Sequence, residues 1–299
     1  MLGEVTERMT MTRFEYVAPT SIDEVTGLLA THRSDAKILA GGQSLVILLR
    51  QRLLAPTVVI SLSRVEALTG IAGTDNGLEI GAMTTYADVS RSALVNQTAP
   101  VLAMAAGSVG SRHIRNRGTV GGSLAHADPA GDVPVALLAL DASINVAGDG
   151  KIRTCASNDW FTGLFEVAMS DDEVLTGVTI PNPPATVSYG YNRFSYREGE
   201  YPMIVACSVL GWDEGMCTSA RVAMGGVGAH PQRLPAVEER LVGSAVDTGD
   251  IDSAAVIAGD LMDPPSDVRG STGWKRKVAV EYMRRALAEA GRGREDGHG

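Results

Sequence analysis

Apolar and polar positions in the first sixty residues follow a pattern that predicts strands and helices in alternation. Residues 12–19, 37–40 and 57–61 read as short strands, and the last of these (TVVIS) is rich in β-branched side chains. Apolar residues recur at helical spacing over 22–30, and a second helix is expected near 44–54. This β-α-β-α-β order predicts a small α/β lobe with parallel strands.

The pattern changes in the middle of the chain, where strands become shorter and helices are rich in small residues. Strands are expected at 68–71, 78–80, 143–147 and 174–180, helices at 84–93, 99–109 and 132–140, and a loop at 118–131. The prolines of Pro181-Asn182-Pro183-Pro184 indicate a linker, because proline restricts its own backbone and that of the preceding residue.

A different organisation is predicted after this linker. Three strands at 189–196, 203–212 and 218–227 suggest an antiparallel meander, followed by helices near 235–242, 250–262 and 271–290. We therefore predict an α+β protein with a first domain at 1–183, a second at 184–290, and a disordered tail at 291–299.

Two glycine corners stand out, because each carries two adjacent glycines. The first is AGGQS in AKILAGGQSLVIL, with Gly41 and Gly42, and the second, 80 positions on, is GTVGGS, with Gly121 and Gly122. Glycine permits positive φ and lets a ligand approach the backbone, and successive free amides form a nest for anions. Each corner alone is also typical of a plain strand–helix turn. Together they fit a ligand with a diphosphate.

Other nucleotide-binding motifs do not account for these corners. Neither matches the P-loop pattern GxxxxGK[ST], and no GxGxxG lies between a predicted strand and helix. Two further groups leave alternatives open. The basic segment 112–117 would face phosphates or an acidic partner, or would be a solvated loop. His126 and Asp128 would form an acid–base pair, or would be polar loop residues.

Composition narrows the function further. The net charge of −9 argues against nucleic acid as the main partner. The longest apolar stretches are far shorter than the roughly 20 residues of a membrane span, and the N-terminus lacks the pattern of a signal peptide, so we expect a cytoplasmic protein. Three cysteines without a CxxC or Cys/His cluster offer no ligand set for zinc or an iron–sulfur centre. No catalytic or metal-binding residue set stands out.

Several segments in a fixed order resemble one family. FEYVAPTSIDEV, LAGGQSLVILLRQRL, IRNRGTVGGSLAHADPAGDVP, DEVLTGVTIP and RFSYREGEYPMIVA cover nearly the whole chain. They resemble the FAD-binding medium subunit of molybdenum hydroxylases, the xanthine dehydrogenase and carbon monoxide dehydrogenase group. The resemblance implies a vanillyl-alcohol-oxidase-like (PCMH-type) FAD-binding domain of two α/β subdomains, with a C-terminal domain built on a three-stranded antiparallel sheet and helices.

The resemblance also implies site residues. Contact with the FAD diphosphate would come from Ala40, Gly41, Gly42, Gln43, Ser44 and Leu45, and from Thr119, Val120, Gly121, Gly122 and Ser123. Asp132 would bind the adenosine side of FAD, and Leu175 would contact the flavin. Arg193, or Asn192 with a shift of one residue, would lie near the isoalloxazine ring, where the family often has a lysine.

The resemblance implies a place in a larger complex. Substrate hydroxylation would occur at a molybdenum pterin cofactor in a large subunit, and two [2Fe–2S] clusters in a small subunit would deliver electrons to FAD in this chain, for transfer to an external acceptor. A dimer of heterotrimers is the habit of the family, and the substrate class includes nitrogen heterocycles. Two other functions are considered: a stand-alone flavin oxidase or dehydrogenase of the same fold, and a non-catalytic nucleotide-binding scaffold.

Overall fold

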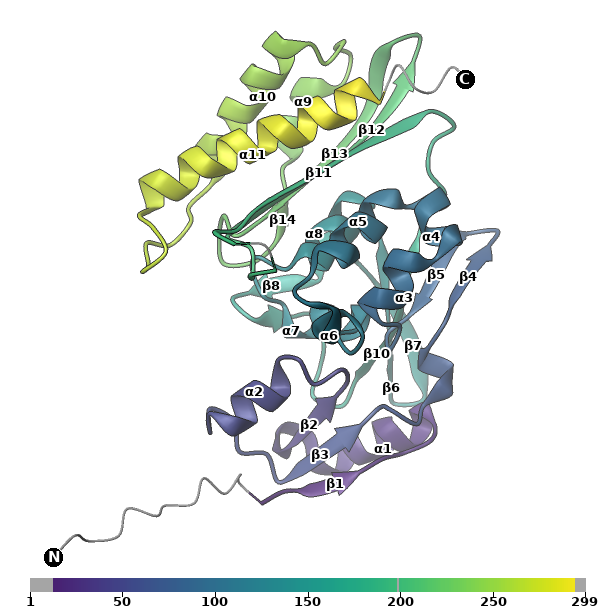
Figure 1. Cartoon of the computed structure of the whole chain (residues 1–299). Coiled ribbons are helices and arrows are strands. Elements are labelled where there is room, and N and C mark those ends of the chain that lie inside the picture. Colours follow the sequence, from purple (N-terminus) through teal and green to yellow (C-terminus); the bar gives the residue numbers. More distant parts are fainter. Residues whose placement is uncertain (1–12, 198, 294–299) are drawn as a thin grey trace, which may run out of the picture.

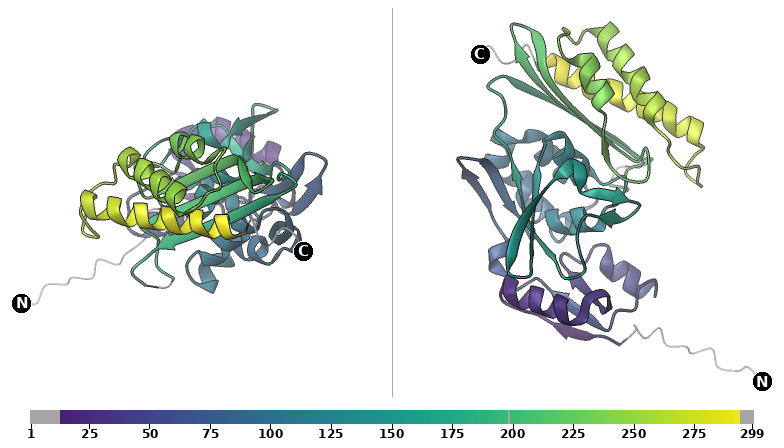
Figure 2. Two further views of the ribbon diagram at one scale, coloured as in Figure 1. Left: turned by 90° about the horizontal axis from the view of Figure 1, so that it is seen from above. Right: turned by 180° about the vertical axis from the view of Figure 1, so that it is seen from behind.

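Three lobes follow one another along the chain, and the computed structural model describes residues 13–197 and 199–293 of it (Figure 1). An N-terminal lobe and a C-terminal lobe lie at opposite ends, with a middle lobe between them. The view from behind shows the same stacking (right panel of Figure 2). Within the described residues, no helix is long and apolar enough to cross a membrane.

The N-terminal lobe is a parallel α/β unit, as predicted. Its elements are β1 (Glu15–Val17), α1 (Ile22–His32), the 3-10 turn η1 (Arg33–Asp35), β2 (Ala36–Leu39), α2 (Leu45–Arg50) and β3 (Val58–Ser61). The strand order is β1-β3-β2, and both pairings are parallel. Ser21 begins α1 by accepting a hydrogen bond from the Glu24 amide, and Val25 and Leu29 bury the inner face of the helix. The first glycine corner joins the end of β2 to α2.

The middle lobe is built on a five-stranded antiparallel sheet. Its strands are β4 (Ile71–Thr74), β5 (Gly77–Gly81), β6 (Ser143–Gly148), β7 (Lys151–Ala156) and β10 (Val174–Ile180), in the order β4-β5-β10-β6-β7. The strand expected at 68–71 starts at Ile71, because residues 66–68 form a 3-10 turn, η2 (Glu66–Leu68). Strand β7 was not predicted, because it is an edge strand of mostly exposed residues with no apolar alternation.

Helices pack against this sheet and against one another. They are α3 (Tyr86–Arg91), α4 (Ala93–Thr98), α5 (Pro100–Ser108), α6 (Arg112–Arg115), α7 (Val120–His126) and α8 (Asp132–Ala139), and a turn η3 (Ser157–Asp159) precedes the hairpin of β8 (Phe161–Gly163) and β9 (Glu166–Val167). The prediction of a loop over 118–131 is therefore wrong for residues 120–126, which form α7. Thr119 begins α7 by accepting a hydrogen bond of 3.1 Å from the Gly122 amide, and this cap offsets the low helix propensity of two glycines.

The C-terminal lobe is an antiparallel sheet with helices on its outer face. The elements are β11 (Val187–Phe194), β12 (Ile204–Asp213), β13 (Met216–Gly225), β14 (Gln232–Arg233), α9 (Pro235–Leu241), α10 (Thr248–Leu261) and α11 (Thr272–Arg292), with the strands in numerical order. The predicted three-stranded meander is present, and the two-residue β14 adds a fourth strand. Figure 2 shows the three helices on the side of the sheet away from the middle lobe. Helix α11 runs through Arg292, two residues into the expected tail; residues 294–299 lie outside the described residues.

Both faces of the C-terminal sheet are buried, and this fixes the second domain on the first. Along β12, Ile204 and Ala206 belong to the core under the helices, whereas Val205 and Cys207 belong to the core of the middle lobe. Successive side chains point to opposite faces of a strand, so a strand covered on both sides reads as a continuous apolar run. Helix α8 lies between the two lobes, and every residue from Asp132 to Ala139 is buried.

Candidate functional site

The first glycine corner presents a row of free backbone amides. Gly42 has φ +75°, a conformation that favours glycine. Within the described residues, the amide N–H groups of Gly41 to Leu45 have no hydrogen-bond acceptor. The Gln43 side chain donates to the Gly41 carbonyl at 3.1 Å, while the Ser44 hydroxyl makes no capping bond to α2. Five unpaired donors on a tight turn form an anion-binding nest.

The second glycine corner is different, and the expectation of a matching row of exposed amides is wrong. The Val120 amide donates to the Thr84 carbonyl at 3.1 Å, and the Gly121 amide donates to the Ala82 carbonyl at 2.8 Å. The Gly122 amide is capped by Thr119, and the Ser123 amide bonds to the Thr119 carbonyl. These donors serve the fold, because they hold the start of α7 against the segment that follows β5.

The glycines of the second corner are required by close packing. A Cβ on Gly121 would lie 2.6 Å from the Ala82 Cβ, and a Cβ on Gly118 would lie 2.5 Å from the Tyr86 ring. Burial raises the pKa of the Tyr86 hydroxyl to about 12. This corner can therefore approach a ligand through side chains and through segments next to the helix start, and not through the amides of residues 120–123.

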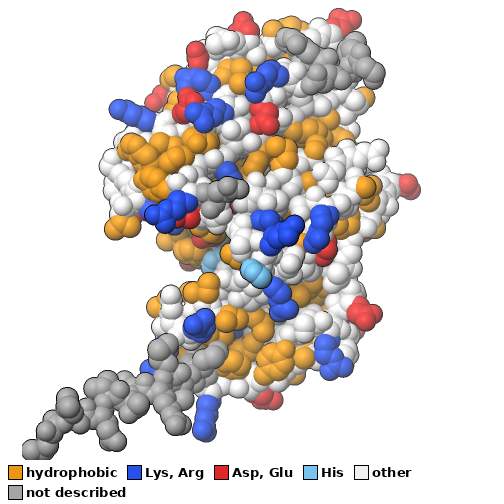
Figure 3. Space-filling model, viewed as in Figure 1, with side chains coloured by type: hydrophobic (Ala, Val, Ile, Leu, Met, Phe, Trp, Pro, Cys, Tyr) orange, Lys and Arg blue, Asp and Glu red, His pale blue; other side chains and the backbone are white. Residues whose placement is uncertain are grey.

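Although 80 residues apart in the sequence, the two corners lie side by side. A Cβ on Gly41 would overlap the Arg117 carbonyl oxygen, and a Cβ on Gly122 would lie 3.5 Å from the Ala40 Cβ. Beside the first corner lies a shallow pocket of about 300 Å³, lined by Leu39, Gly41, Gly42, Gln43, Val46, Ile47 and, from the position just before the second corner, Arg117. In the space-filling view, Lys/Arg and His side chains gather at the waist over α6, next to apolar surface on the N-terminal lobe (Figure 3).

Four of these lining residues were not among the predicted site residues. Leu39, Val46 and Ile47 provide an apolar wall, and Val46 and Ile47 remain exposed to solvent. Exposed apolar residues at the start of a helix are a signal that sequence reading can find only when the outward face of the helix is known. Arg117 belongs to the basic segment, for which two interpretations were left open.

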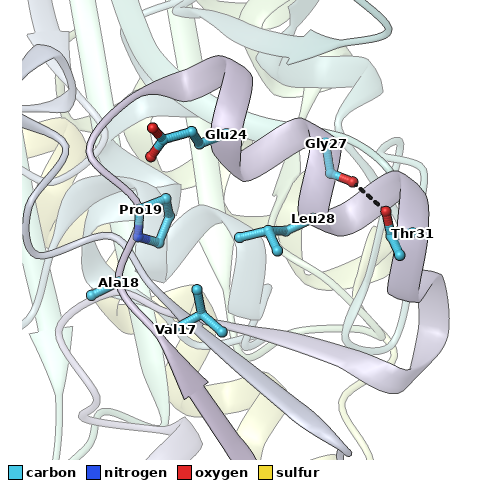
Figure 4. Close-up of a pocket in the computed structure, with 7 residues that line it drawn as sticks. All are labelled: Val17, Ala18, Pro19, Glu24, Gly27, Leu28 and Thr31. Carbon is cyan, nitrogen blue, oxygen red and sulfur yellow. Dashed lines mark hydrogen bonds between the residues drawn. The ribbon is translucent and has the colours of Figure 1, made fainter.

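A second surface pocket, of about 480 Å³, lies between the end of β1 and α1 (Figure 4). Its lining is mostly apolar, and Glu24 and Thr31 are its polar side chains. Thr31 donates to the Gly27 carbonyl at 2.8 Å, and Glu24 accepts from the Thr20 amide at 2.7 Å, so both polar groups serve the local fold. None of the predicted site residues lines it. The pocket at the glycine corners is therefore the candidate site, despite its smaller volume.

Asp132 and Arg193, predicted at opposite ends of the cofactor, lie together. Arg193 Nε lies 2.9 Å from Asp132 Oδ1 as an ion pair, but its N–H is not aimed at that oxygen. The rest of the guanidinium donates to the carbonyls of Ser108 at 3.1 Å and Glu200 at 2.8 Å. The neighbouring Asn192 amide donates to Glu289 at 2.8 Å. These side chains thus tie β11 to the middle lobe and to α11.

The Asp132 carboxylate also accepts a hydrogen bond of 2.6 Å from the Tyr191 hydroxyl. Burial raises the pKa of Asp132, and the charge of Arg193 and the Tyr191 hydrogen bond oppose that rise. Burial and the Asp132 charge hold the pKa of Tyr191 well above its usual range. Leu175, the last of the predicted residues, is buried in the core of the middle lobe beside an irregularity in the β10–β6 pairing.

His126 and Asp128 do not form an obvious acid–base pair. The His126 ring contacts Phe165, with centroids 5.3 Å apart, and burial lowers its pKa while the charge of Asp128 opposes this. Asp128 Oδ1 accepts from the Ala130 amide at 3.0 Å, a short-range contact typical of a loop. Within the described residues, no cluster of three or more His, Cys, Asp or Glu side chains could hold a metal ion.

Fold and site together define a flavoprotein-type α+β protein: a two-part cofactor domain whose glycine corners meet, followed by a sheet-and-helix domain. Residues 12–183 match the family model described as "FAD binding domain in molybdopterin dehydrogenase", and residues 189–290 match "CO dehydrogenase flavoprotein C-terminal domain". The chain belongs to the family of FAD-binding medium subunits of molybdopterin dehydrogenases, the carbon monoxide dehydrogenase and xanthine dehydrogenase family.

Known proteins of this family are similar to the chain over nearly their whole length. The nicotine 6-hydroxylase medium subunit of Paenarthrobacter nicotinovorans is 35% identical over 283 residues, covering 95% of this chain and 99% of that protein. The structure of carbon monoxide dehydrogenase from Hydrogenophaga pseudoflava has a chain that superposes with a TM-score of 0.93 at 32% identity, covering 95% of this chain and 99% of that one. A chain of quinoline 2-oxidoreductase from Pseudomonas putida 86 superposes with a TM-score of 0.90 at 32% identity, again covering 95% of this chain and 99% of that one.

The chain is thus a flavoprotein subunit of a molybdenum-dependent dehydrogenase, and its relatives are subunits of multi-subunit complexes. This membership decides among the three functions considered from the sequence. It favours the flavoprotein subunit over a stand-alone flavin oxidase and over a non-catalytic scaffold.

Proposed function

We propose that this chain carries FAD as the electron-transfer subunit of a molybdenum hydroxylase complex. It accepts electrons from two [2Fe–2S] clusters of a small subunit and passes them to an external acceptor, while a small substrate is hydroxylated at a molybdenum pterin site in a large subunit. The observation that carries the proposal is the row of free amides at Gly41 to Leu45, beside a pocket that Arg117 also lines. The family membership supplies the identity of the cofactor.

The residues at the corners fit the diphosphate of FAD. The free amides supply donors without a counter-charge of their own, and Gly41 and Gly42 leave the backbone open to a phosphate oxygen. Thr119 fixes the start of α7, and the Ser44 hydroxyl adds a donor at the rim. Asp132 would contact the adenosine side of FAD, and Leu175 and Arg193 would contact the flavin. FAD, when bound, supplies the redox chemistry that side chains do not provide.

The proposed [2Fe–2S] clusters require partner subunits, because this chain lacks the ligands to hold them. A [2Fe–2S] cluster needs four protein ligands, usually cysteines, and this chain has three cysteines in all. Cys207 and Cys217 are buried, and burial raises the pKa of both thiols, which disfavours the thiolate that iron requires. Separate small and large subunits, assembled as a dimer of heterotrimers, would hold the clusters and the molybdenum.

The proposed substrate class is a nitrogen heterocycle. Support comes from the printed names of two relatives, nicotine 6-hydroxylase and quinoline 2-oxidoreductase. Carbon monoxide dehydrogenase, with an inorganic substrate in its name, is almost as similar in sequence. Sequence identity in this subunit is therefore only weakly related to the substrate of the complex, as expected if the substrate binds to another subunit.

Purification of the native complex tests the proposal. Mass spectrometry of co-purified chains, metal analysis and a flavin absorbance near about 450 nm should reveal three kinds of subunit, molybdenum, iron and FAD. Recovery of this chain alone as an active, molybdenum-free flavoprotein would support the stand-alone oxidase instead. A colourless complex would contradict any flavin function.

A further inference from the structure

The cations of the basic segment 112–117 have different roles in the structure. The Arg115 guanidinium donates to the carbonyls of Val109 at 3.1 Å and Gly110 at 2.7 Å, so it holds the turn between α5 and α6. The guanidinium of Arg117 makes no hydrogen bond or ion pair within the described part of the chain, and neither does that of Arg112. Arg117 lines the pocket at the glycine corners, and Arg112 does not.

The pocket lacks a positive charge unless Arg117 supplies it. The amides of Gly41 to Leu45 carry only partial charges, and the amides of the second corner are used within the fold. Among the residues that the structure describes, no other lysine, arginine or histidine lines this pocket. A guanidinium beside backbone donors is a frequent arrangement for phosphate, because the amides fix the position of the oxygens and the cation balances their charge.

The backbone contact between the corners places this cation. Gly41 packs directly on the Arg117 carbonyl, and the Gly118 amide donates to the Ile114 carbonyl at 2.7 Å, which closes the turn after α6. Residue 117 is thus fixed relative to the amide row by main-chain contacts on both sides. A side chain that starts from a fixed backbone loses less freedom when it binds a ligand.

We propose that Arg117 is the phosphate-binding cation of this pocket. Together with the amides of Gly41 to Leu45 it forms a subsite for a nucleoside diphosphate, which binds even without the isoalloxazine ring. The inference rests on the proposed FAD function and adds to it a residue and a division of roles: the first corner supplies amides, and the second segment supplies charge.

Binding to the full-length chain freed of flavin tests this inference. FAD is titrated by quenching of flavin fluorescence, and ADP and riboflavin by calorimetry. The variant Arg117→Gln should weaken FAD and ADP by about tenfold or more, since a hydrogen bond from a charged donor is lost. Riboflavin, which has no phosphate, should bind the variant and the wild type alike. The salt dependence of ADP binding should also decrease in the variant, because the lost contact is ionic.

Two further variants serve as controls. Arg112→Gln removes an equally unpaired cation five residues away, and should change the dissociation constants by less than about twofold. Arg117→Lys keeps the charge but lacks the planar guanidinium group, so its affinity for FAD and ADP should lie between those of the wild type and Arg117→Gln. Urea unfolding of each variant checks that the fold is retained, and the exposed position of Arg117 predicts unchanged midpoints.

The outcomes separate the inference from the proposed function. If the wild type fails to bind FAD, the proposed function itself fails. If the wild type binds FAD, but Arg117→Gln binds FAD and ADP equally well, then the role of Arg117 is wrong and the FAD function stands. If the wild type binds FAD but not ADP, the glycine corners are not an independent diphosphate subsite.

Discussion

Tyr191 donates a hydrogen bond of 2.6 Å to Asp132, and this buried contact joins the sheet of the C-terminal lobe to the first turn of α8 in the middle lobe. Both side chains are nearly inaccessible to solvent. A hydroxyl that donates to a buried carboxylate compensates part of the cost of removing that charge from water. The contact therefore bears on how the two domains are held together.

Removal of the Tyr191 hydroxyl should destabilise the protein. We expect Tyr191→Phe to lower the free energy of unfolding by about 1.5–3 kcal/mol, the range for hydrogen bonds to charged groups. Urea denaturation measures this. A double-mutant cycle with Asp132→Ala should show coupling, because each variant removes one partner of the same contact. Additive effects of the two substitutions would contradict a direct energetic link between these residues.

A side chain at Gly41 should abolish retention of the cofactor. In Gly41→Val, the new Cβ meets the Arg117 carbonyl and forces the two glycine corners apart. The purified protein should therefore retain almost none of the wild-type flavin content. Absorbance of released flavin, compared with protein concentration, measures this content.

Gly27→Ala is a suitable control for Gly41→Val. Gly27 lies in α1 and lines the other pocket, and a Cβ there would have no neighbour within 4 Å. Flavin content should be unchanged, and stability should rise by about 0.5–1 kcal/mol, since alanine is the better helix former. A loss of flavin in this variant would indicate that the pocket beside α1, and not the glycine corner, holds the cofactor.

Gly121 should matter for the fold before it matters for the cofactor. The Cβ of Gly121→Ala would lie 2.6 Å from the Ala82 Cβ and 2.9 Å from the Ala82 carbonyl. We expect a loss of about 1–3 kcal/mol in the free energy of unfolding, as for other overpacked sites. Gly273→Ala, with no atom within 4 Å of the new Cβ, is the control. Full stability combined with loss of flavin would show instead that Gly121 contacts the ligand.

Acid stability should depend on the pairing of Arg153 with Glu173. Two hydrogen bonds of 2.6 Å from the Arg153 guanidinium lower the pKa of Glu173 below its usual 4.5. A carboxylate with a lowered pKa in the folded state stabilises above the pKa of the unfolded chain, and loses this effect as the pH falls through the folded-state pKa. The free energies of unfolding of the wild type and Glu173→Gln should therefore differ at pH 7, and this difference should shrink as the pH falls below 4.5. A constant difference across this range would rule out the ionic origin.

Much of the fold could be predicted from the order of apolar runs. The parallel N-terminal lobe and the antiparallel meander followed from alternation and helical spacing, because these elements bury one clear face or both. Strand β7 and helix α7 escaped prediction, since β7 is exposed at an edge and α7 begins with two glycines. In α7 a threonine cap and tight packing on Ala82 overrule local propensity.

The sequence alone determined where the backbone could come close to something else: the two double glycines, 80 residues apart, marked positions at which a side chain would not fit. It could not tell whether the close neighbour is a ligand or the protein itself, because hydrogen-bond partners of an amide lie far away in the chain. Tertiary structure decided this. It uses the amides of Val120 to Ser123 within the fold, leaves those of Gly41 to Leu45 free, and sets Arg117 beside them.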